Sequence, residues 1–140
     1  YLIVYDGSRP VAVFPAAVGA AAGDKRREGD RRTPEGRFSV CLKNPESKYV
    51  LSLGLSYPNI EDARRGLREG LISRVEYDAI VSAVRAGKPP PWNTALGGEI
   101  MIHGRRNGGR GTLGCVALED AAIRTLYPRI PVGTPVLIRP

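Results

Sequence analysis

The chain has 140 residues, a hydrophobic fraction of 42% and a formal net charge of +7. This length suffices for one domain whose core needs no disulfides, and the composition argues against a disordered chain. The sequence contains no run of about 18 apolar residues, which excludes a membrane-spanning helix, and the positive charge favours polyanionic partners: nucleic acid, anionic lipid or a cell-wall polymer.

The N-terminal third predicts strands joined by polar loops. Residues 2–5 and 11–18 are apolar and β-branched, and the polar segment between them predicts a hairpin with a short loop. Residues 19–32 are rich in glycine and charge and predict an exposed loop. The tetrapeptide TPEG, residues 33–36, has proline and glycine at the second and fourth positions of a type I turn. Residues 49–53 predict another short strand.

The strand between the TPEG turn and residues 49–53 has the alternating pattern of a half-buried sheet. Its apolar side chains point one way and its polar ones the other. The apolar set is Phe38, Val40 and Leu42, and the opposite set is Ser39, Cys41 and Lys43. We therefore expect Cys41 on the polar face, as a spare thiol.

After Asn59 the apolar period becomes helical. Asn59 is an expected N-cap and Gly70 an expected helix end, while Ser73 and Glu76 form a capping box for a second helix. The insert of residues 60–92 is interpreted either as a lid or as core-packing helices, and the second interpretation is favoured.

The C-terminal part returns to strands. Residues 100–102, 115–118 and 135–139 predict strands, and 119–126 predicts a short helix. Since the sequence contains no internal repeat and no linker, we expect residues 1–140 to form a single domain. The expected fold class is mainly β (α+β), with a helical insert around residues 60–87.

The stretch IMIHGRRNGGRGTLGCVALED carries the chemistry. His103 and Cys115 lie 12 residues apart on either side of a glycine-rich loop. A free thiol, whose pKa is about 8.5, becomes a nucleophile when an imidazole takes its proton and a third group holds the imidazole tautomer. Gly114 permits close approach of substrate, and the backbone amides of Gly114 and Cys115 are candidate oxyanion donors. The alternative is a buried thiol and a strand-end histidine without function.

No metal and no cofactor is expected. One histidine and one nearby cysteine fall short of the three or four ligands that zinc requires.

Several segments together resemble a known family. IMIHG followed by TLGCVAL is similar to the signature of the YkuD-type L,D-transpeptidase catalytic domain, and GDRRTPEGRF matches its TPxGxF turn and strand. The segments LSYPN and VGTPVLI resemble the YafK-like murein branch, so the resemblance covers nearly the whole chain. It implies a β-sandwich-like catalytic domain.

The resemblance also implies a reaction. Members are exported enzymes in which a cysteine attacks the third residue of a peptidoglycan stem peptide and expels the D-amino acid at position four. The thioester is resolved by an amine of a second stem, giving a 3→3 crosslink, or by another amine or water. Carried over, Cys115 is the nucleophile, His103 its base, and the Gly104 carbonyl holds the imidazole, while Thr112 braces the loop. Carbapenem β-lactams are implied as inhibitors, and the implied location is periplasmic or extracytoplasmic.

The chain departs from the family pattern in two respects. The spacing of 12 residues is shorter than in most members, and Ala117 stands where the common pattern has arginine. We expect Arg105, Arg106 or Arg110 to replace that arginine in binding the anionic stem. Two residues, Tyr57 and Asn59, are tentative cleft residues; a turn that caps a helix accounts for them almost equally well.

Other functions stay open. A hydrolase acting on the same wall bonds is the nearest alternative, followed by a non-catalytic wall-binding module. A nucleic-acid binder is disfavoured because the chain has two Phe and one Trp, without a stacking surface. The basic run of residues 25–32 either grips an anionic polymer or is a solvated loop. The start at Tyr1 fits either a processed, exported protein or an excised domain.

Overall fold

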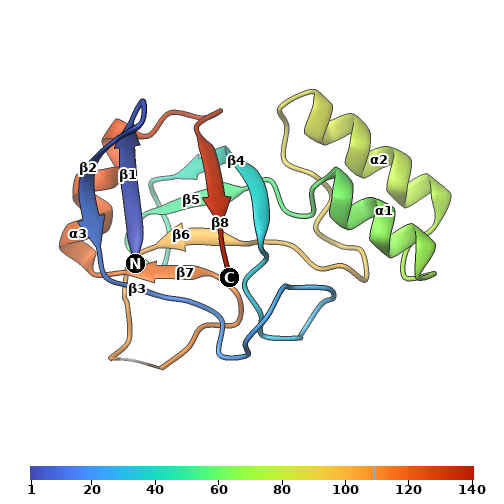
Figure 1. Ribbon diagram of the computed structural model, residues 1–140, viewed down its shortest axis with the longest axis horizontal. Coiled ribbons are helices and arrows are strands. Elements are labelled where there is room, and N and C mark those ends of the chain that lie inside the picture. Colours follow the sequence, from blue (N-terminus) through green and yellow to red (C-terminus); the bar gives the residue numbers. More distant parts are fainter. Residues whose placement is uncertain (109) are drawn as a thin grey trace.

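A six-stranded sheet and a separate hairpin carry the strands of the computed structural model, which describes residues 1–108 and 110–140 (Figure 1). The strands are β1 (Leu2–Asp6), β2 (Arg9–Phe14), β3 (Ala16–Ala17), β4 (Gly36–Asn44), β5 (Ser52–Leu55), β6 (Met101–His103), β7 (Val116–Leu118) and β8 (Pro135–Ile138). The helices are α1 (Ile60–Arg68), α2 (Arg74–Arg85) and α3 (Asp120–Leu126), with a 3-10 turn at Tyr127–Arg129. The large sheet has the order β3-β7-β6-β5-β4-β8. The predicted fold class, mainly β with a helical insert, is confirmed.

The main core lies where the sheet packs against the hairpin and α3. Leu55, Leu118 and Ile123 are completely buried in it. From the hairpin, the inward side chains Leu2 and Val4 pack against this cluster. Burial of apolar side chains of this size contributes about 1.5–3 kcal/mol each to folding, so this cluster fixes the strands that carry the site.

The helical insert packs mainly on itself, at the end of the molecule opposite α3 (Figure 1). Its small core contains Ala63, Ile72, Ile80 and Leu96. Both helices begin at the predicted N-caps with complete capping boxes, and those predictions are confirmed. Among residues 1–108 and 110–140, no helix has the length and apolar character needed to cross a membrane.

Two adjacent strands define the face on which the site forms. β6 and β7 run parallel, with Ile102 opposite Val116 and His103 opposite Ala117. Successive side chains of a strand point to opposite faces. Because Ile102 and Val116 belong to the buried core, His103 and Cys115 project from the other face of the sheet.

Two predicted strands have different limits in the structure. The expected strand over residues 11–18 is interrupted at Pro15, which has no amide hydrogen for a ladder, and β3 beyond it pairs with β7 instead of β1. The expected strand at residues 49–53 begins only at Ser52, because Val50 has a left-handed backbone with φ of 76°.

The predicted position of Cys41 on the polar face is wrong, although its thiol is unpaired as expected. The register of β4 against β5 shifts between Val40 and Leu42, so Val40 and Cys41 are both buried. The Cys41 Sγ donates to the Gly54 carbonyl at 3.5 Å. Burial raises the pKa of this thiol to about 11, which makes it unreactive at neutral pH.

The loop at residues 19–32 is not exposed throughout. Lys25 is only 4% exposed, and its ammonium donates to Asp30 Oδ1 at 2.9 Å and to the Arg27 carbonyl at 3.0 Å. The Asp30 carboxylate also accepts from backbone amides of the loop, and its pKa is lowered to about 2 despite the opposing effect of burial. This loop is therefore folded around a buried ion pair.

Candidate active site

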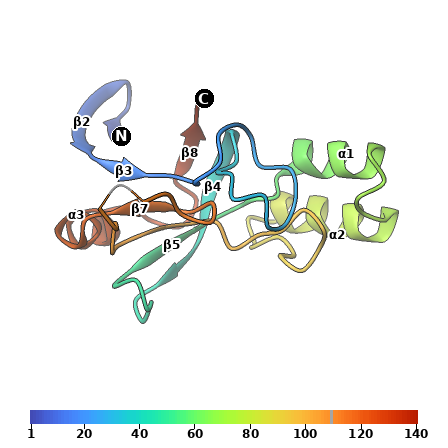
Figure 2. The ribbon, with the colours of Figure 1, turned by 90° about the horizontal axis from the view of Figure 1, so that it is seen from below.

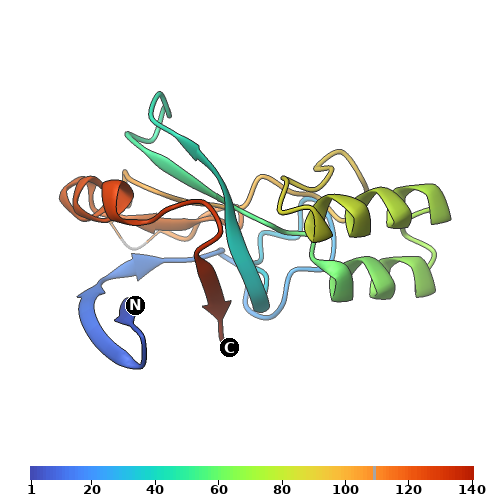
Figure 3. The ribbon, with the colours of Figure 1, turned by 90° about the horizontal axis from the view of Figure 1, so that it is seen from above.

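His103 and Cys115 line one groove of about 1020 Å³ on the face of the sheet opposite the core. Its walls come from three parts of the chain: residues 25–31, the loop between β4 and β5 with the start of β5, and residues 98–117. Figures 2 and 3 show that the β4–β5 loop extends from the sheet on the side opposite the N-terminal hairpin and the C-terminus. None of the described residues that line this groove comes from α1 or α2, so the two helices do not cover it in this structure.

His103 is held by its own backbone neighbour. Its Nδ1 lies 2.6 Å from the carbonyl oxygen of Gly104, so in the neutral ring Nδ1–H donates and Nε2 keeps its lone pair. One face of the imidazole is covered by the Tyr49 ring, with centroids 4.3 Å apart and planes inclined by 23°. Burial lowers the pKa of His103, although the Gly104 carbonyl opposes this shift. The neutral form of the imidazole is therefore favoured, with Nε2 as its acceptor atom.

Gly104 is required by its surroundings. A Cβ at this position would lie 2.7 Å from the Tyr49 carbonyl oxygen, 3.0 Å from Ile123 Cγ2 and 3.1 Å from Asp120 Oδ1. The Gly104 amide donates to the same Tyr49 oxygen at 2.9 Å. The absence of a side chain thus lets the backbone that holds the imidazole pack directly against the β4–β5 loop.

Cys115 lies directly before β7, with its sulfur between two backbone groups. The Met101 amide donates to Sγ and Sγ–H donates to the Glu99 carbonyl, both at 3.4 Å. Glu99 has φ of 56°, a conformation that costs a non-glycine residue about 1–3 kcal/mol. Burial raises the pKa of the Cys115 thiol and the Glu99 carboxylate adds to this, while the Met101 amide and the Lys25 ammonium lower it. The opposite shifts of Cys115 and His103 favour a neutral thiol beside a neutral imidazole.

Two threonines brace the loop before Cys115. Thr112 Oγ1 donates to the Cys115 carbonyl at 2.6 Å and accepts from the Gly114 amide at 3.0 Å. Thr33 Oγ1 accepts from the Gly19 amide and donates to the Gly114 carbonyl, both at 2.8 Å. The backbone amide and the carbonyl of Gly114 are thereby both hydrogen-bonded.

This bracing changes the oxyanion assignment. The Gly114 amide already donates to Thr112, which leaves the Cys115 amide as the candidate donor of the predicted pair. Gly114 has φ of 142°, and a Cβ there would lie 2.8 Å from the Arg32 carbonyl oxygen. The loop geometry therefore requires glycine at this position.

The three predicted arginines occupy different places. Arg105 and Arg110 line the groove, whereas Arg106 is turned to Glu119, with Nη1 3.0 Å from Oε1. Ala117 lies opposite His103 across the β6–β7 pair and lines the groove, so the position of the missing arginine is beside the imidazole.

The tentative cleft assignment of Tyr57 and Asn59 is corrected by their positions. Tyr57 is completely buried, with its hydroxyl donating to the Leu96 carbonyl at 2.6 Å. Asn59 caps α1, and its Nδ2 donates to the Arg37 carbonyl at 3.1 Å. Neither residue lines the groove, and the alternative of a turn that caps a helix accounts for both.

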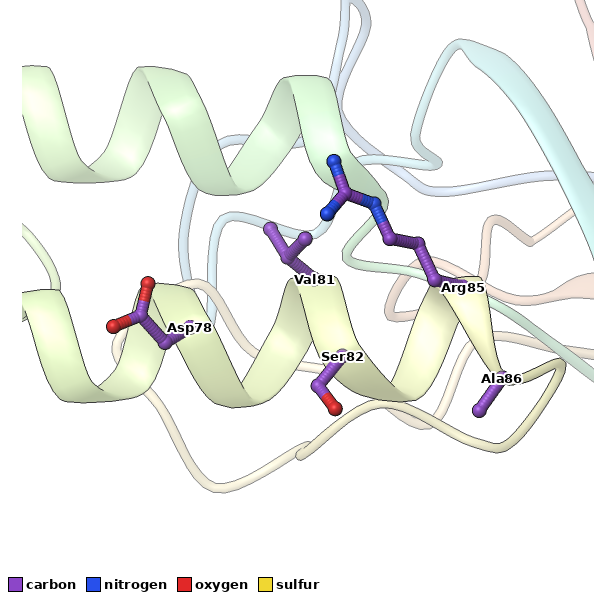
Figure 4. A pocket seen from close by; sticks show the side chains of 5 residues that line it. All are labelled: Asp78, Val81, Ser82, Arg85 and Ala86. Atoms are coloured by element: carbon purple, nitrogen blue, oxygen red, sulfur yellow. The ribbon is translucent and has the colours of Figure 1, made fainter.

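Among the described residues there is no group of three or more histidine, cysteine or acidic side chains that could hold a metal ion. A second, open hollow lies on the surface of α2, and its lining side chains come from that helix and its C-cap residue Ala86 (Figure 4). It shares no residue with the groove.

Comparison with protein families identifies the domain. The family profile of the L,D-transpeptidase catalytic domain, YkuD, matches residues 1–138. The chain belongs to the YkuD family of L,D-transpeptidase catalytic domains. The family prediction from the sequence is thus confirmed, while the assignment to the YafK-like branch stays a prediction.

Solved structures share the YkuD fold. Bd1075 of Bdellovibrio bacteriovorus is 23% identical with a TM-score of 0.58, over 94% of this chain and 39% of that one. The helical cell shape determining protein Pgp2 of Campylobacter jejuni is 23% identical with a TM-score of 0.56, over 86% and 36%. An L,D-transpeptidase of Xylanimonas cellulosilytica is 18% identical with a TM-score of 0.57, over 98% and 54%. The chain thus spans between about a third and a half of the length of these proteins, and at such identities they establish the fold.

A comparison with curated protein sequences gives no significant match.

Several residues that contact the YkuD signature or line its groove could not be recognised from local sequence pattern. Tyr49 was expected to begin a strand, yet it covers His103; Thr33 was expected only to form a turn, yet it holds the Gly114 carbonyl. Lys25 belongs to the basic run of residues 25–32, for which a grip on an anionic polymer and a solvated loop were both considered, and it lines the groove. These contacts join residues far apart in the sequence, and local pattern contains no signal for them.

Proposed function

We propose that this YkuD domain is a cysteine acyltransferase that acts on peptidoglycan stem peptides through a thioester on Cys115. The observation that carries the proposal is the placement of His103 and Cys115 on one face of neighbouring parallel strands, in one groove. Membership of the L,D-transpeptidase catalytic domain family supports the substrate class.

In the proposed first half-reaction, Cys115 Sγ attacks the carbonyl carbon of the third stem residue while His103 Nε2 takes the thiol proton. The tetrahedral oxyanion receives a hydrogen bond from the Cys115 amide. The C–N bond to the fourth residue then breaks, the leaving amine takes the proton from His103, and a D-amino acid departs. The products are the thioester and the free amino acid.

In the second half-reaction an amine of another stem attacks the thioester carbonyl and gives its proton to His103. Breaking of the C–S bond releases the new amide, and the proton returns to Cys115. Water in place of the amine would give the free acid, which is the hydrolytic alternative. The nucleophile that reaches the thioester, an amine or water, decides between transfer and hydrolysis.

The protonation states of His103 and Cys115 before substrate binds fit a mechanism in which His103 takes the thiol proton while Cys115 attacks the substrate carbonyl. Burial lowers the pKa of His103 and raises that of Cys115, so the neutral pair is favoured before substrate binds. The thiol proton is directed at the Glu99 carbonyl at 3.4 Å and must turn to the imidazole for transfer. The Met101 amide then remains as a donor to the developing thiolate.

The charges of the groove support an anionic substrate. Five cationic side chains line it against two carboxylates. The cations are Lys25, Arg31, Lys48, Arg105 and Arg110, and the carboxylates are Glu28 and Glu99. Because Lys25 is already paired with Asp30, we propose Arg105 and Arg110 as the groups that bind stem carboxylates in place of the arginine missing at Ala117.

The proposed substrate implies an extracytoplasmic location, where peptidoglycan is assembled, and acylation of Cys115 by carbapenems. Likeness to the cell shape determining protein Pgp2 adds support for a role in wall architecture. The second candidate, a non-catalytic wall-binding module, is disfavoured because the two threonines hold the Cys115 loop in one geometry.

Product analysis after incubation with a purified disaccharide tetrapeptide tests this proposal. The wild type is expected to release the terminal D-amino acid, and Cys115→Ala to release none. Cys41→Ala is the matched control and should retain activity, since Cys41 lies in the core. A stem dimer identifies a transferase and a tripeptide alone a hydrolase. Sacculus binding by the wild type, without any product at pH 6–9, would support the wall-binding module instead.

A further inference from the structure

Tyr49 lies in the loop between β4 and β5 and lines the groove beside His103. Its ring stacks on the imidazole with centroids 4.3 Å apart and an interplanar angle of 23°. Tyr49 is itself 39% exposed, whereas His103 is 6% exposed. The aromatic ring therefore separates one face of the imidazole from water.

Backbone contacts fix Tyr49 in this place. Its carbonyl accepts from the Gly104 amide at 2.9 Å, and its amide donates to Ser47 Oγ at 3.0 Å. Ser47 Oγ is 2.6 Å from Ser52 Oγ, and Ser52 is the residue opposite His103 in the β5–β6 ladder. The loop that carries the Tyr49 ring is thus tied to β5 and to Gly104, directly after β6.

A ring in this position acts differently on the two forms of histidine. The negative face of an aromatic ring attracts a cation, and the attraction is worth more where water is excluded. The Gly104 carbonyl accepts the Nδ1 proton in both forms and also favours the imidazolium. Ring and carbonyl together offset the burial that disfavours the charged form.

We infer that Tyr49 is a positioning residue that holds the imidazole of His103 through its ring face and stabilises the imidazolium formed when Cys115 loses its proton. This inference rests on the proposed function for its catalytic meaning. It assigns the role to the aromatic face and not to the phenol hydroxyl. Tyr49→Phe should therefore keep the effect on His103, and Tyr49→Leu should lose it.

The other charged and titratable groups around the imidazole are few. Lys48 has its Nζ 5.2 Å from the Tyr49 ring centroid and is exposed to solvent. Asp120 Oδ1 accepts from the Arg105 amide, next to Gly104. Cys115 shares the groove with the imidazole. None of these residues is substituted in the Tyr49 variants. The Lys48 ammonium loses its contact with the ring in Tyr49→Leu, but it is exposed to solvent, where its charge is screened, so a shift between the variants reports mainly on the ring.

Histidine titration by NMR tests the inference directly, because His103 is the single histidine of the chain and gives one imidazole signal. Three proteins are compared: wild type, Tyr49→Phe and Tyr49→Leu, the last keeping an apolar cover without an aromatic face. We expect Tyr49→Phe to titrate with the wild-type midpoint and Tyr49→Leu to titrate about 0.4–0.7 pH units lower. Equal midpoints for Phe and Leu, or a higher midpoint for Leu, would overturn the inference.

Alkylation of Cys115 by iodoacetamide provides the second readout. At pH 6–7 the rate for Tyr49→Leu should be about two- to fivefold below those of wild type and Tyr49→Phe, because less imidazolium–thiolate pair forms. Equal rates for all three would count against the inference. A His103→Gln variant separates the proposed function from the role of Tyr49. If the Cys115 of this variant is alkylated as fast as that of the wild type, the proposed function fails. The NMR comparison still decides the role of Tyr49.

Discussion

Replacement of Thr33 by valine should loosen the catalytic loop from a distance. Thr33 is 7% exposed, and its hydroxyl joins the Gly19 amide to the Gly114 carbonyl through two hydrogen bonds of 2.8 Å. Valine has nearly the same shape and fills the same space, so the substitution removes the two hydrogen bonds without creating a cavity.

The expected cost follows from what is left unpaired. A buried polar group that loses its partner costs about 1–3 kcal/mol, so two such groups lower the free energy of unfolding by about 2–4 kcal/mol after partial relaxation. With a urea m-value of about 2 kcal/mol/M, the midpoint of unfolding moves down by about 1–2 M. The released Gly114 carbonyl should also slow alkylation of Cys115 by about tenfold or more, since the thiol loses its fixed position.

Urea unfolding and iodoacetamide kinetics on Thr33→Val and Thr33→Ser measure both effects. Serine keeps the hydroxyl and should remain close to the wild type in both assays. If valine and serine variants unfold at the same urea concentration and alkylate at the same rate, the bracing role of Thr33 is refuted.

Three further predictions concern the groove. Gly114→Ala should lower both stability and activity, by more than about 2 kcal/mol in urea unfolding, because φ of 142° and the Arg32 carbonyl oxygen 2.8 Å away exclude a Cβ. Arg110→Ala should raise KM for a tetrapeptide about two- to tenfold at unchanged kcat, while Arg106→Ala, whose guanidinium faces Glu119, should leave KM unchanged; equal effects would refute the assignment. The folded-state pKa of His103 is lowered, so the unfolded chain binds more protons and this histidine destabilises the fold as pH falls below about 6.5. Urea unfolding from pH 7.5 to 5 should show this loss, and His103→Gln should reduce it.

Local patterns predicted the elements that local interactions determine. The capping box of Ser73 and Glu76 involves residues three apart, and the structure contains it as predicted. Val116 and Leu118, on the short strand after Cys115, are buried in the main core. Such features are determined by residues within one helical turn or one strand.

Features that depend on contacts between residues far apart in the sequence could not be predicted from local pattern. Cys41 changed face because a bulge shifts the register of β4, and the alternating pattern contains no sign of it. Lys25 is buried because the Asp30 carboxylate and the Arg27 carbonyl replace water around its ammonium, although a lysine in a charged loop is ordinarily exposed. Tyr57 was a tentative cleft residue with a helix-capping turn as the alternative, and the Leu96 carbonyl holds it in the core.

The candidate site shows the same division. His103 and Cys115 stand out by residue type and spacing, while Tyr49 and Thr33 reach them only through tertiary packing. Tyr49 comes into contact because Ser52 pairs with His103 in the sheet and the loop before it folds back. No one-dimensional pattern specifies that pairing.

The most direct test of the central claim is the intact mass of the protein, quenched in acid during turnover of a disaccharide tetrapeptide and followed by peptide mapping. The wild type and Cys41→Ala should gain the mass of the stem acyl group without its terminal D-amino acid. That mass should map to the peptide containing Cys115, and hydroxylamine should remove it. Cys115→Ala should gain none. An adduct on Cys41, the same adduct in Cys115→Ala, or product formation by Cys115→Ala at the wild-type rate would contradict a Cys115 thioester.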